Sequence, residues 1–208
     1  RTVGPEVWVH VAALVAAVRL ASTSSAAMAR DIVCSGSFEE VNEYFLAHEF
    51  SDGLPIVPPT IDKVEAFLQH VDRDADEVLG VMLPDNRAAT VWSVAVNGVM
   101  AGCRPEYMPV LLAAIEAALE PVFTLHGVLA TTYFSGPVII VTGPVVKRIG
   151  MNSGVNALGQ GNRANATIGR ALQLIVRNVG GGLPGGMDRA TLGNPGKFSY
   201  CIAEREEL

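Results

Sequence analysis

The segment from Thr90 to Gly102, TVWSVAVNGVMAG, constrains the fold more than any other part of this sequence. Its residues are almost all apolar or small, and a helix without a solvent-facing side has to be surrounded by protein. A length of 208 residues, a hydrophobic content of 50% and a mean hydropathy of +0.33 supply enough apolar material to surround it. We therefore expect one domain with this helix at its centre.

Helical patterns lie on both sides of this segment. Ser37 and Glu40 have the spacing of a capping box and predict a helix over about 38–49, while Thr60 is placed to cap a second helix. The three prolines of SDGLPIVPPT (51–60) favour an extended connection between the two.

The second half of the chain mixes helix and strand signals. Pro105 suits the first position of a helix through EYMPVLLAAIEAALE, with Pro109 delaying its regular start, and a further helix is predicted from about 163 to 178. Strands are predicted in VLGVMLP (78–84, buried), HGVLATTY (126–133), PVIIVTGPV (137–145) and KFSYCIAE (197–204). The predicted fold class is α/β (mixed α+β), a single domain with a small sheet flanked by helices.

The N-terminal region has a different composition. VWVHVAALVAAV (7–18) imitates the hydrophobic region of a secretory signal, but His10 and Arg19 keep the apolar run well below the ~20 residues that span a bilayer. We interpret residues 1–36 as a helical segment that docks on the domain or on a neighbouring chain, and residues 37–208 as the single α/β domain.

Charge and cysteine content exclude several classes of protein. The net charge is −6, only 17% of residues are charged, and no basic run follows a helix, which argues against nucleic acid as a partner. Few polar residues remain to cover a monomer, so we expect a homo-oligomer or a subunit of a larger complex. Cys34, Cys103 and Cys201 have neither CxxC spacing nor paired histidines, which argues against a disulfide framework or a structural zinc site and favours a reducing, cytoplasmic location.

The first candidate site is GQGNRANATIGRA (159–171), where a helix is expected to begin. Asn162 can cap it, and Arg163 lies at its positive end beside unpaired backbone N–H groups, an arrangement that suits a carboxylate or phosphate. The glycine spacing is neither a Walker loop nor GxGxxG. An equally weighted alternative is a glycine turn into a helix whose arginines pair with surface acids. The predicted substrate-binding residues here are Asn152, Ser153, Asn156, Gly161, Asn162, Arg163 and Asn165.

Cys103 is the second candidate, just before a predicted helix and next to Arg104. A helix N-terminus and a neighbouring cation both favour the thiolate, so we predict a lowered pKa and a role as nucleophile or redox thiol. The alternative is a small buried cysteine packed between apolar helices. Cys201 is expected in the core, and Cys34 is expected to be an exposed linker thiol.

The third candidate is the glycine-rich loop GGGLPGGMDRATLGNPGK (180–197), of a length typical of lids and binding loops. Asp188 or Glu204 would move protons, and Arg189 and Lys197 would clamp the substrate's charge. A solvated salt bridge explains the same residues equally well. His126 begins a predicted strand and is a candidate for entry into a site. No HExxH motif or carboxylate cluster suggests a metal, and no cofactor is indicated.

Several of these stretches together resemble an uncharacterised bacterial family associated with redox proteins that carry a selenocysteine or cysteine Gly-Ser-Cys motif (UGSC-type). They are DGLPIVPPT (52–60), NGVMAGCRPEYMPVLLAAIEA (97–117), GNRANATIGRA (161–171) and TLGNPGKFSYCIAE (191–204). The resemblance covers about residues 40–204. It implies work beside a thiol or selenol redox protein, as a domain or subunit of a reductase-like enzyme. This chain has no Gly-Ser-Cys motif, so that centre must lie elsewhere.

We therefore expect an enzyme, or a substrate-binding subunit of one, that acts on a small anionic organic molecule by thiol-dependent redox or lyase chemistry at Cys103. The alternatives are a non-catalytic assembly protein and a metal-dependent hydrolase that uses His126 and Asp188. One pocket that joins 97–103, 152–165 and 188–197 favours the enzyme, whereas separate positions favour assembly.

Overall fold

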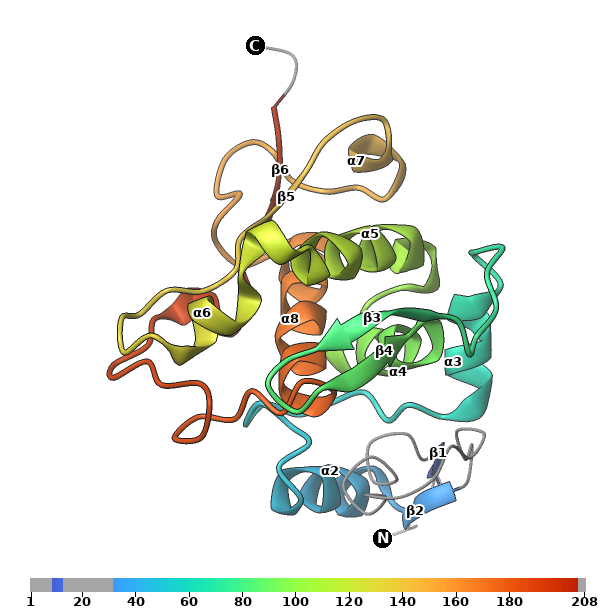
Figure 1. The fold of residues 1–208 in the computed structure, drawn as a ribbon. Helices are drawn as coiled ribbons and strands as arrows, with labels where there is room; N and C mark the ends of the chain where they lie inside the picture. Colours follow the sequence, from blue (N-terminus) through green and yellow to red (C-terminus); the bar gives the residue numbers. More distant parts are fainter. Residues whose placement is uncertain (1–8, 13–31, 206–208) are drawn as a thin grey trace, which may run out of the picture.

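The structure is a computed structural model that describes residues 9–12 and 32–205 (Figure 1). These residues form a mixed α/β single domain in which helices pack against small two-stranded sheets, as the sequence predicted. The helices are α2 (Phe38–Ala47), α3 (Ile61–Leu68), α4 (Val91–Ala101), α5 (Met108–Leu119), α6 (Leu125–Ala130), α7 (Val145–Arg148) and α8 (Arg163–Asn178). The strands are β1 (Val9–Ala12), β2 (Ile32–Gly36), β3 (Val78–Met82), β4 (Arg87–Thr90), β5 (Ile139–Val141) and β6 (Cys201–Ala203).

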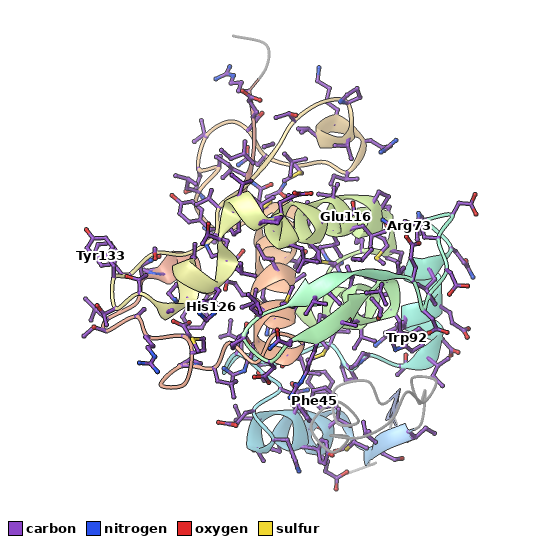
Figure 2. All side chains as sticks on the ribbon, in the orientation of Figure 1. Phe45, Arg73, Trp92, Glu116, His126 and Tyr133 are labelled. Atoms are coloured by element: carbon purple, nitrogen blue, oxygen red, sulfur yellow. The ribbon has the colours of Figure 1, made fainter. Side chains whose placement is uncertain are left out.

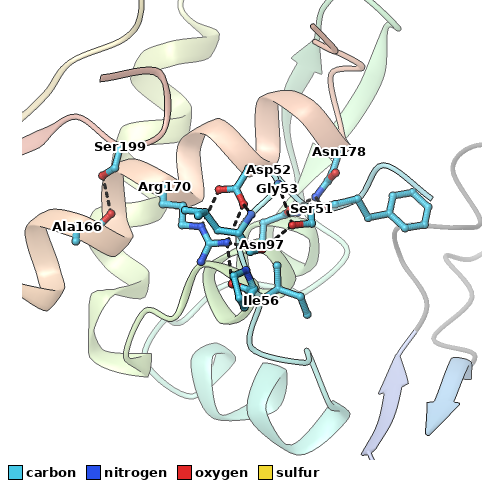
Figure 3. A network of polar contacts seen from close by, with 12 residues as sticks. Ser51, Asp52, Gly53, Ile56, Asn97, Ala166, Arg170, Asn178 and Ser199 are labelled. Atoms are coloured by element: carbon cyan, nitrogen blue, oxygen red, sulfur yellow. Dashed lines mark hydrogen bonds and ion pairs between the residues drawn. The ribbon is translucent and has the colours of Figure 1, made fainter. Parts of the chain in front are cut away.

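Helix α4 is the centre of the core, as its composition predicted. Every one of its residues is buried, and it contacts α3, α5 and α8. Thr90 caps it by accepting from the Ser93 N–H, and the Ser93 side chain accepts from Thr90 N–H in return. The buried Asn97 keeps its polar groups paired, because its side chain donates to the Ser93 carbonyl and accepts from Asn178 on α8 (Figure 3).

The described residues also contain three short 3-10 turns. Pro105–Tyr107 and Pro121–Phe123 are 3-10 turns before α5 and α6, and Pro195–Lys197 is a third turn within the glycine-rich loop. The first turn confirms the delayed start of the helix predicted at Pro105. Arg73, after α3, forms an ion pair of 2.5 Å with Glu116 of α5 (Figure 2). This pair connects the segment after α3 to α5.

The strands form three separate two-stranded sheets among the described residues. β3 and β4 form an antiparallel hairpin, whereas β5 pairs in parallel with β6, with Ile139 opposite Cys201. The strand predicted at 126–133 is wrong, because α6 occupies its first half and buries Leu125 and Leu129, one turn apart, on one face. β3 is also not the buried strand that we expected, since only its last residue, Met82, is buried. The hairpin lies at the surface beside α5, and one of its faces meets solvent.

The N-terminal segment is not helical where the structure describes it. β1 and β2 pair antiparallel, with His10 opposite Ser35, so the predicted helical docking segment over 1–36 is wrong at these residues. The rest of that segment lies outside the described residues. The β-branched residues of VHVA and IVCSG account for the pairing. Cys34 therefore lies half-buried in a strand and is not an exposed linker thiol.

Among the described residues, no single helix has the length and apolar character needed to cross a membrane. One bent pair, Pro105–Leu119 with Pro121–Ala130, meets these criteria together, with a bend of 68°.

Candidate functional site

Helix α8 begins and ends where the sequence placed it, and its start is closed by its own asparagines. The Asn162 side chain accepts from the Asn165 N–H at 3.0 Å, which confirms the predicted cap, and donates to the Gly150 carbonyl at 2.8 Å. The apolar residues of this helix recur at i, i+4 and i+7 and form one buried stripe: Ala164, Ile168, Ala171, Leu172, Ile175 and Val179 are all buried.

Asn165 is buried, and its side chain fixes the loop that precedes α8. Its Oδ1 accepts from the Asn152 N–H, and its Nδ2 donates to the carbonyls of Asn152 and Ala157. The Asn152 side chain in turn donates to the Val155 carbonyl, and Asn156 donates to Gln160. These amides satisfy backbone groups of their own loop, and this use competes with binding of a ligand.

The two remaining binding candidates of this segment belong to the same turn. Ser153 is half-buried within the loop, and Gly161 is exposed with a φ of 114°, a conformation that favours glycine at the entry to α8. Further along the helix, a Cβ on Gly169 would lie 2.6 Å from the Tyr200 nitrogen. This glycine therefore serves the close approach of the segment that leads into β6, where Ser199 donates to the Ala166 carbonyl (Figure 3).

The three arginines that recur every seven residues on α8 fasten other chain segments to the helix. Arg163 Nε donates to the Gly102 carbonyl at 2.9 Å, and Arg177 Nε donates to the Glu49 carbonyl at 2.8 Å. Arg170 holds Asp52 through two bonds of 2.8 Å and also donates to the carbonyls of Leu54 and Pro55 (Figure 3). This row attaches the Asp-Gly-Leu-Pro segment to α8, so Arg170 makes a nearly buried ion pair and not the surface pair that we considered.

Cys103 is sealed in the core beside α8. It is only 6% exposed, and burial raises the pKa of its thiol from 9.0 to about 12, against smaller lowering effects from Thr167 and Arg163. The predicted lowering of this pKa is therefore wrong, because desolvation outweighs the helix terminus and the nearby cations. Cys201 is buried as expected, and burial raises its pKa to about 12 as well.

A cavity of about 630 Å³ lies further along α8, between this helix, Asp52 and the loop from Gly182 to Phe198; we call it the loop cleft. Lys197 Nζ and Asp188 Oδ1 are 2.8 Å apart on its wall, with side chains only 17% and 13% exposed. Gln173 and Arg177 also line it, from neighbouring turns of α8. The cavity has the size of a metabolite site and carries charged groups of both signs.

The sequence-predicted residues therefore divide between two places. Asp188 and Lys197 line the loop cleft, whereas no residue of 97–103 or 152–165 does. The single pocket that was expected to favour an enzyme is therefore not formed, and this separation counts in favour of the assembly alternative. Arg163 and Arg177 are fourteen residues apart on one helix, which at 1.5 Å per residue separates the two places by about 20 Å. Arg189 is exposed outside the cleft lining, and its N–H donates to the Leu129 carbonyl. Glu204 is exposed at the end of β6, where its N–H donates to the Val141 carbonyl.

The loop cleft also contains residues that the sequence reasoning did not assign to a site. They are Asp52, Gln173 and Arg177, whereas Asn194 belongs to the predicted glycine-rich loop. The i, i+4 spacing of Gln173 and Arg177 on the polar face of α8 was a usable signal, as was Asp52 at the start of the proline-rich segment. Nothing in the sequence pattern shows that these two segments meet, because the Arg170–Asp52 pair joins positions 118 residues apart.

His126 is exposed on α6 and does not line the loop cleft. Over residues 9–12 and 32–205, no group of three or more His, Cys, Asp or Glu residues is arranged to hold a metal ion. The hydrolase alternative, which needs His126 beside Asp188, has no support in this geometry.

Comparison with known proteins gives no match: no family model, no curated protein and no solved structure is similar to this chain. The resemblance inferred from the sequence motifs therefore stays a prediction.

Proposed function

We propose that this chain binds a small organic anion in the loop cleft and acts on it as an enzyme or as the substrate-binding subunit of one. The observation that carries the proposal is the Lys197–Asp188 pair. It combines low exposure with a place on the wall of a metabolite-sized cavity. A surface salt bridge contributes little to stability, whereas a cation held on a cavity wall offers a ligand a charged contact in a setting of reduced dielectric.

The other polar groups that line the cleft would orient such a ligand. Arg177 and Gln173 line the cleft from α8, and Lys197 lines it from the loop. In our proposal the Lys197 ammonium keeps its bonds to Asp188 and to the Ser135 carbonyl and gives its third N–H to the negative group of the ligand. Cys103 has no place in this chemistry, because its thiol is buried and its pKa is raised.

The thiol or selenol redox partner implied by the sequence resemblance stays part of the proposal only as an external protein. Neither buried cysteine is a source of thiolate at neutral pH, since the pKa of each thiol is raised to about 12. A redox step on the bound anion would therefore not draw on Cys103 or Cys201.

The proposal is tested by isothermal titration calorimetry with acetate, phenylacetate, succinate and inorganic phosphate. Lys197→Met removes a charged contact and should lower the affinity for any carboxylate that binds by about tenfold or more. Lys63→Met is the matched control. Lys63 donates to the Pro58 carbonyl at 3.4 Å, as Lys197 does to the Ser135 carbonyl, but it does not line the loop cleft. If none of the four probes binds, or if both lysine variants weaken binding equally, the proposal fails.

A second candidate function is assembly, with another copy of this chain as the partner. An apolar groove of about 370 Å³ runs between α5 and β5, and Ile140 at its edge is 60% exposed. A parallel sheet is usually covered on both faces, but the β5–β6 sheet leaves Ile140 exposed on one of them. Sedimentation velocity should show a dimer that Ile140→Glu dissociates, whereas a monomeric wild-type chain would remove this candidate.

A further inference from the structure

The loop cleft changes character from its interior to its mouth. Its charged pair, Lys197 and Asp188, is largely withdrawn from solvent. Leu192 and Phe198 line the same cavity, but they are 90% and 49% exposed. Pro184 and Pro195 are also exposed and complete an apolar rim. Charge therefore lies inside and apolar surface lies at the entrance.

The rim is held in this position by the chain that surrounds it. The N–H of Thr191, next to Leu192, donates to the Thr132 carbonyl at 3.0 Å. On the other side, the Asn194 side chain donates to the Phe134 carbonyl and accepts from the Gly196 N–H at 2.8 Å. Because Leu192 stands between two such anchors, a ligand that covers it would not have to order the loop first.

From this arrangement we infer that the ligand of the loop cleft is an amphipathic carboxylate, with an anionic end at Lys197 and an aromatic or branched apolar body against Leu192 and Phe198. The inference rests on the proposed function and narrows it to one class of substrate. A compact dicarboxylate or an inorganic phosphate would satisfy the interior but leave the rim exposed to water. An apolar body removes that rim from water, and affinity rises with the apolar area that is buried.

The test compares phenylacetate with acetate and succinate by isothermal titration calorimetry. We expect phenylacetate to bind at least about tenfold more tightly than either. Leu192→Ser and Phe198→Ser should each reduce that advantage, because they remove apolar contact at the rim while the charged pair stays. Both positions are on an exposed loop, so neither variant is expected to unfold the domain.

The matched control is Val155→Ser. Val155 is 95% exposed and apolar like Leu192, but it belongs to the loop before α8 and does not line the loop cleft. Its variant should keep the full advantage of phenylacetate.

The other outcomes separate the two proposals. If acetate or succinate binds as tightly as phenylacetate and Lys197→Met abolishes that binding, the amphipathic class is overturned and the anion site stands. If phenylacetate keeps its affinity in Lys197→Met, the anionic contact is overturned. If no probe binds, both proposals fall.

Discussion

The two halves of α8 show how similar polar residues come to serve different ends. At its N-terminal end, Asn162 and Asn165 give their side chains to backbone groups of the helix and of the loop before it. Beside the C-terminal half of α8, backbone N–H groups of the glycine-rich loop donate to the carbonyls of Leu129 and Thr132. Lys197 and Asp188 of this loop form an ion pair that lines the loop cleft. Lys197 and Asp188 also bond to backbone groups, but at 3.4 Å, whereas the backbone bonds of Asn162 and Asn165 measure 2.8–3.2 Å. A polar residue beside a glycine turn is therefore more available to a ligand where its bonds to the backbone are long.

The largest expected effect concerns Cys103, at the closed end. The pKa of its thiol is raised from 9.0 to about 12, so its thiolate fraction at pH 8 should fall by roughly three orders of magnitude. Iodoacetamide should accordingly label Cys103 about a thousandfold more slowly in the native chain than in guanidinium, followed by mass spectrometry of the Cys103 peptide. A native labelling rate that levels off near or below pH 9 would return this thiol to the candidate nucleophiles.

The same shift has a consequence for stability, with a definite sign. Because the pKa is higher in the folded chain, the protonated thiol stabilises the fold fully below pH 9, and this contribution is lost as the pH rises towards 12. Cys103→Ala should therefore lose less stability between pH 8 and pH 11 than the wild type. Denaturant unfolding at the two pH values measures the difference, and an equal loss in both proteins would contradict the assignment.

Asn165→Ala carries the next largest effect. The asparagine is buried and bonds to Asn152 and Ala157, so its removal leaves backbone groups without partners and should cost about 2–3 kcal/mol of unfolding free energy. Asn194→Ala, in the loop cleft, is the matched change and should cost less than about 1 kcal/mol, because Asn194 is half-exposed and water can replace it. Urea unfolding measures the loss of unfolding free energy in both variants. Equal losses would contradict the distinction between the start of α8 and the loop cleft.

Some of this architecture follows from sequence because it depends on local pattern. α4 could be placed at the centre since none of its faces suits solvent, and α8 could be bounded because an asparagine cap precedes a regular apolar stripe. α6 was missed because its β-branched neighbours Thr131 and Thr132 masked the one-turn spacing of Leu125 and Leu129.

The candidate site was predictable only in part, for a different reason. Lys197 and Asp188 could be proposed from the length and composition of their loop. The contribution of Asp52 to the cleft could not, because its ion-pair partner Arg170 is 118 residues away in the sequence. Glu204 was wrongly grouped with Asp188 because the two are near in sequence. Glu204 follows β6, which pairs with β5, and it does not line the loop cleft.

A smaller effect is expected from Asn162→Ala. This change removes the side-chain cap of α8 and the bond to the Gly150 carbonyl, and caps of this type contribute about 1 kcal/mol. Phenylacetate affinity should stay unchanged, because the residue does not line the loop cleft. Unfolding in urea and calorimetry on the same preparation test both statements. A loss of affinity without a loss of stability would show that the helix start takes part in binding.

The smallest effect is the most informative about where a ligand binds. Arg163 is exposed and makes one bond to a backbone carbonyl, so Arg163→Met should cost about 0.5 kcal/mol or less. Since the neighbouring N–H of Asn165 is already capped by Asn162, the loss of this charge should change phenylacetate affinity less than twofold. Lys197→Met removes the same formal charge but should weaken binding about tenfold or more. Should calorimetry give the opposite order, the two halves of α8 exchange roles, and the helix start becomes the anion site despite its internal bonds.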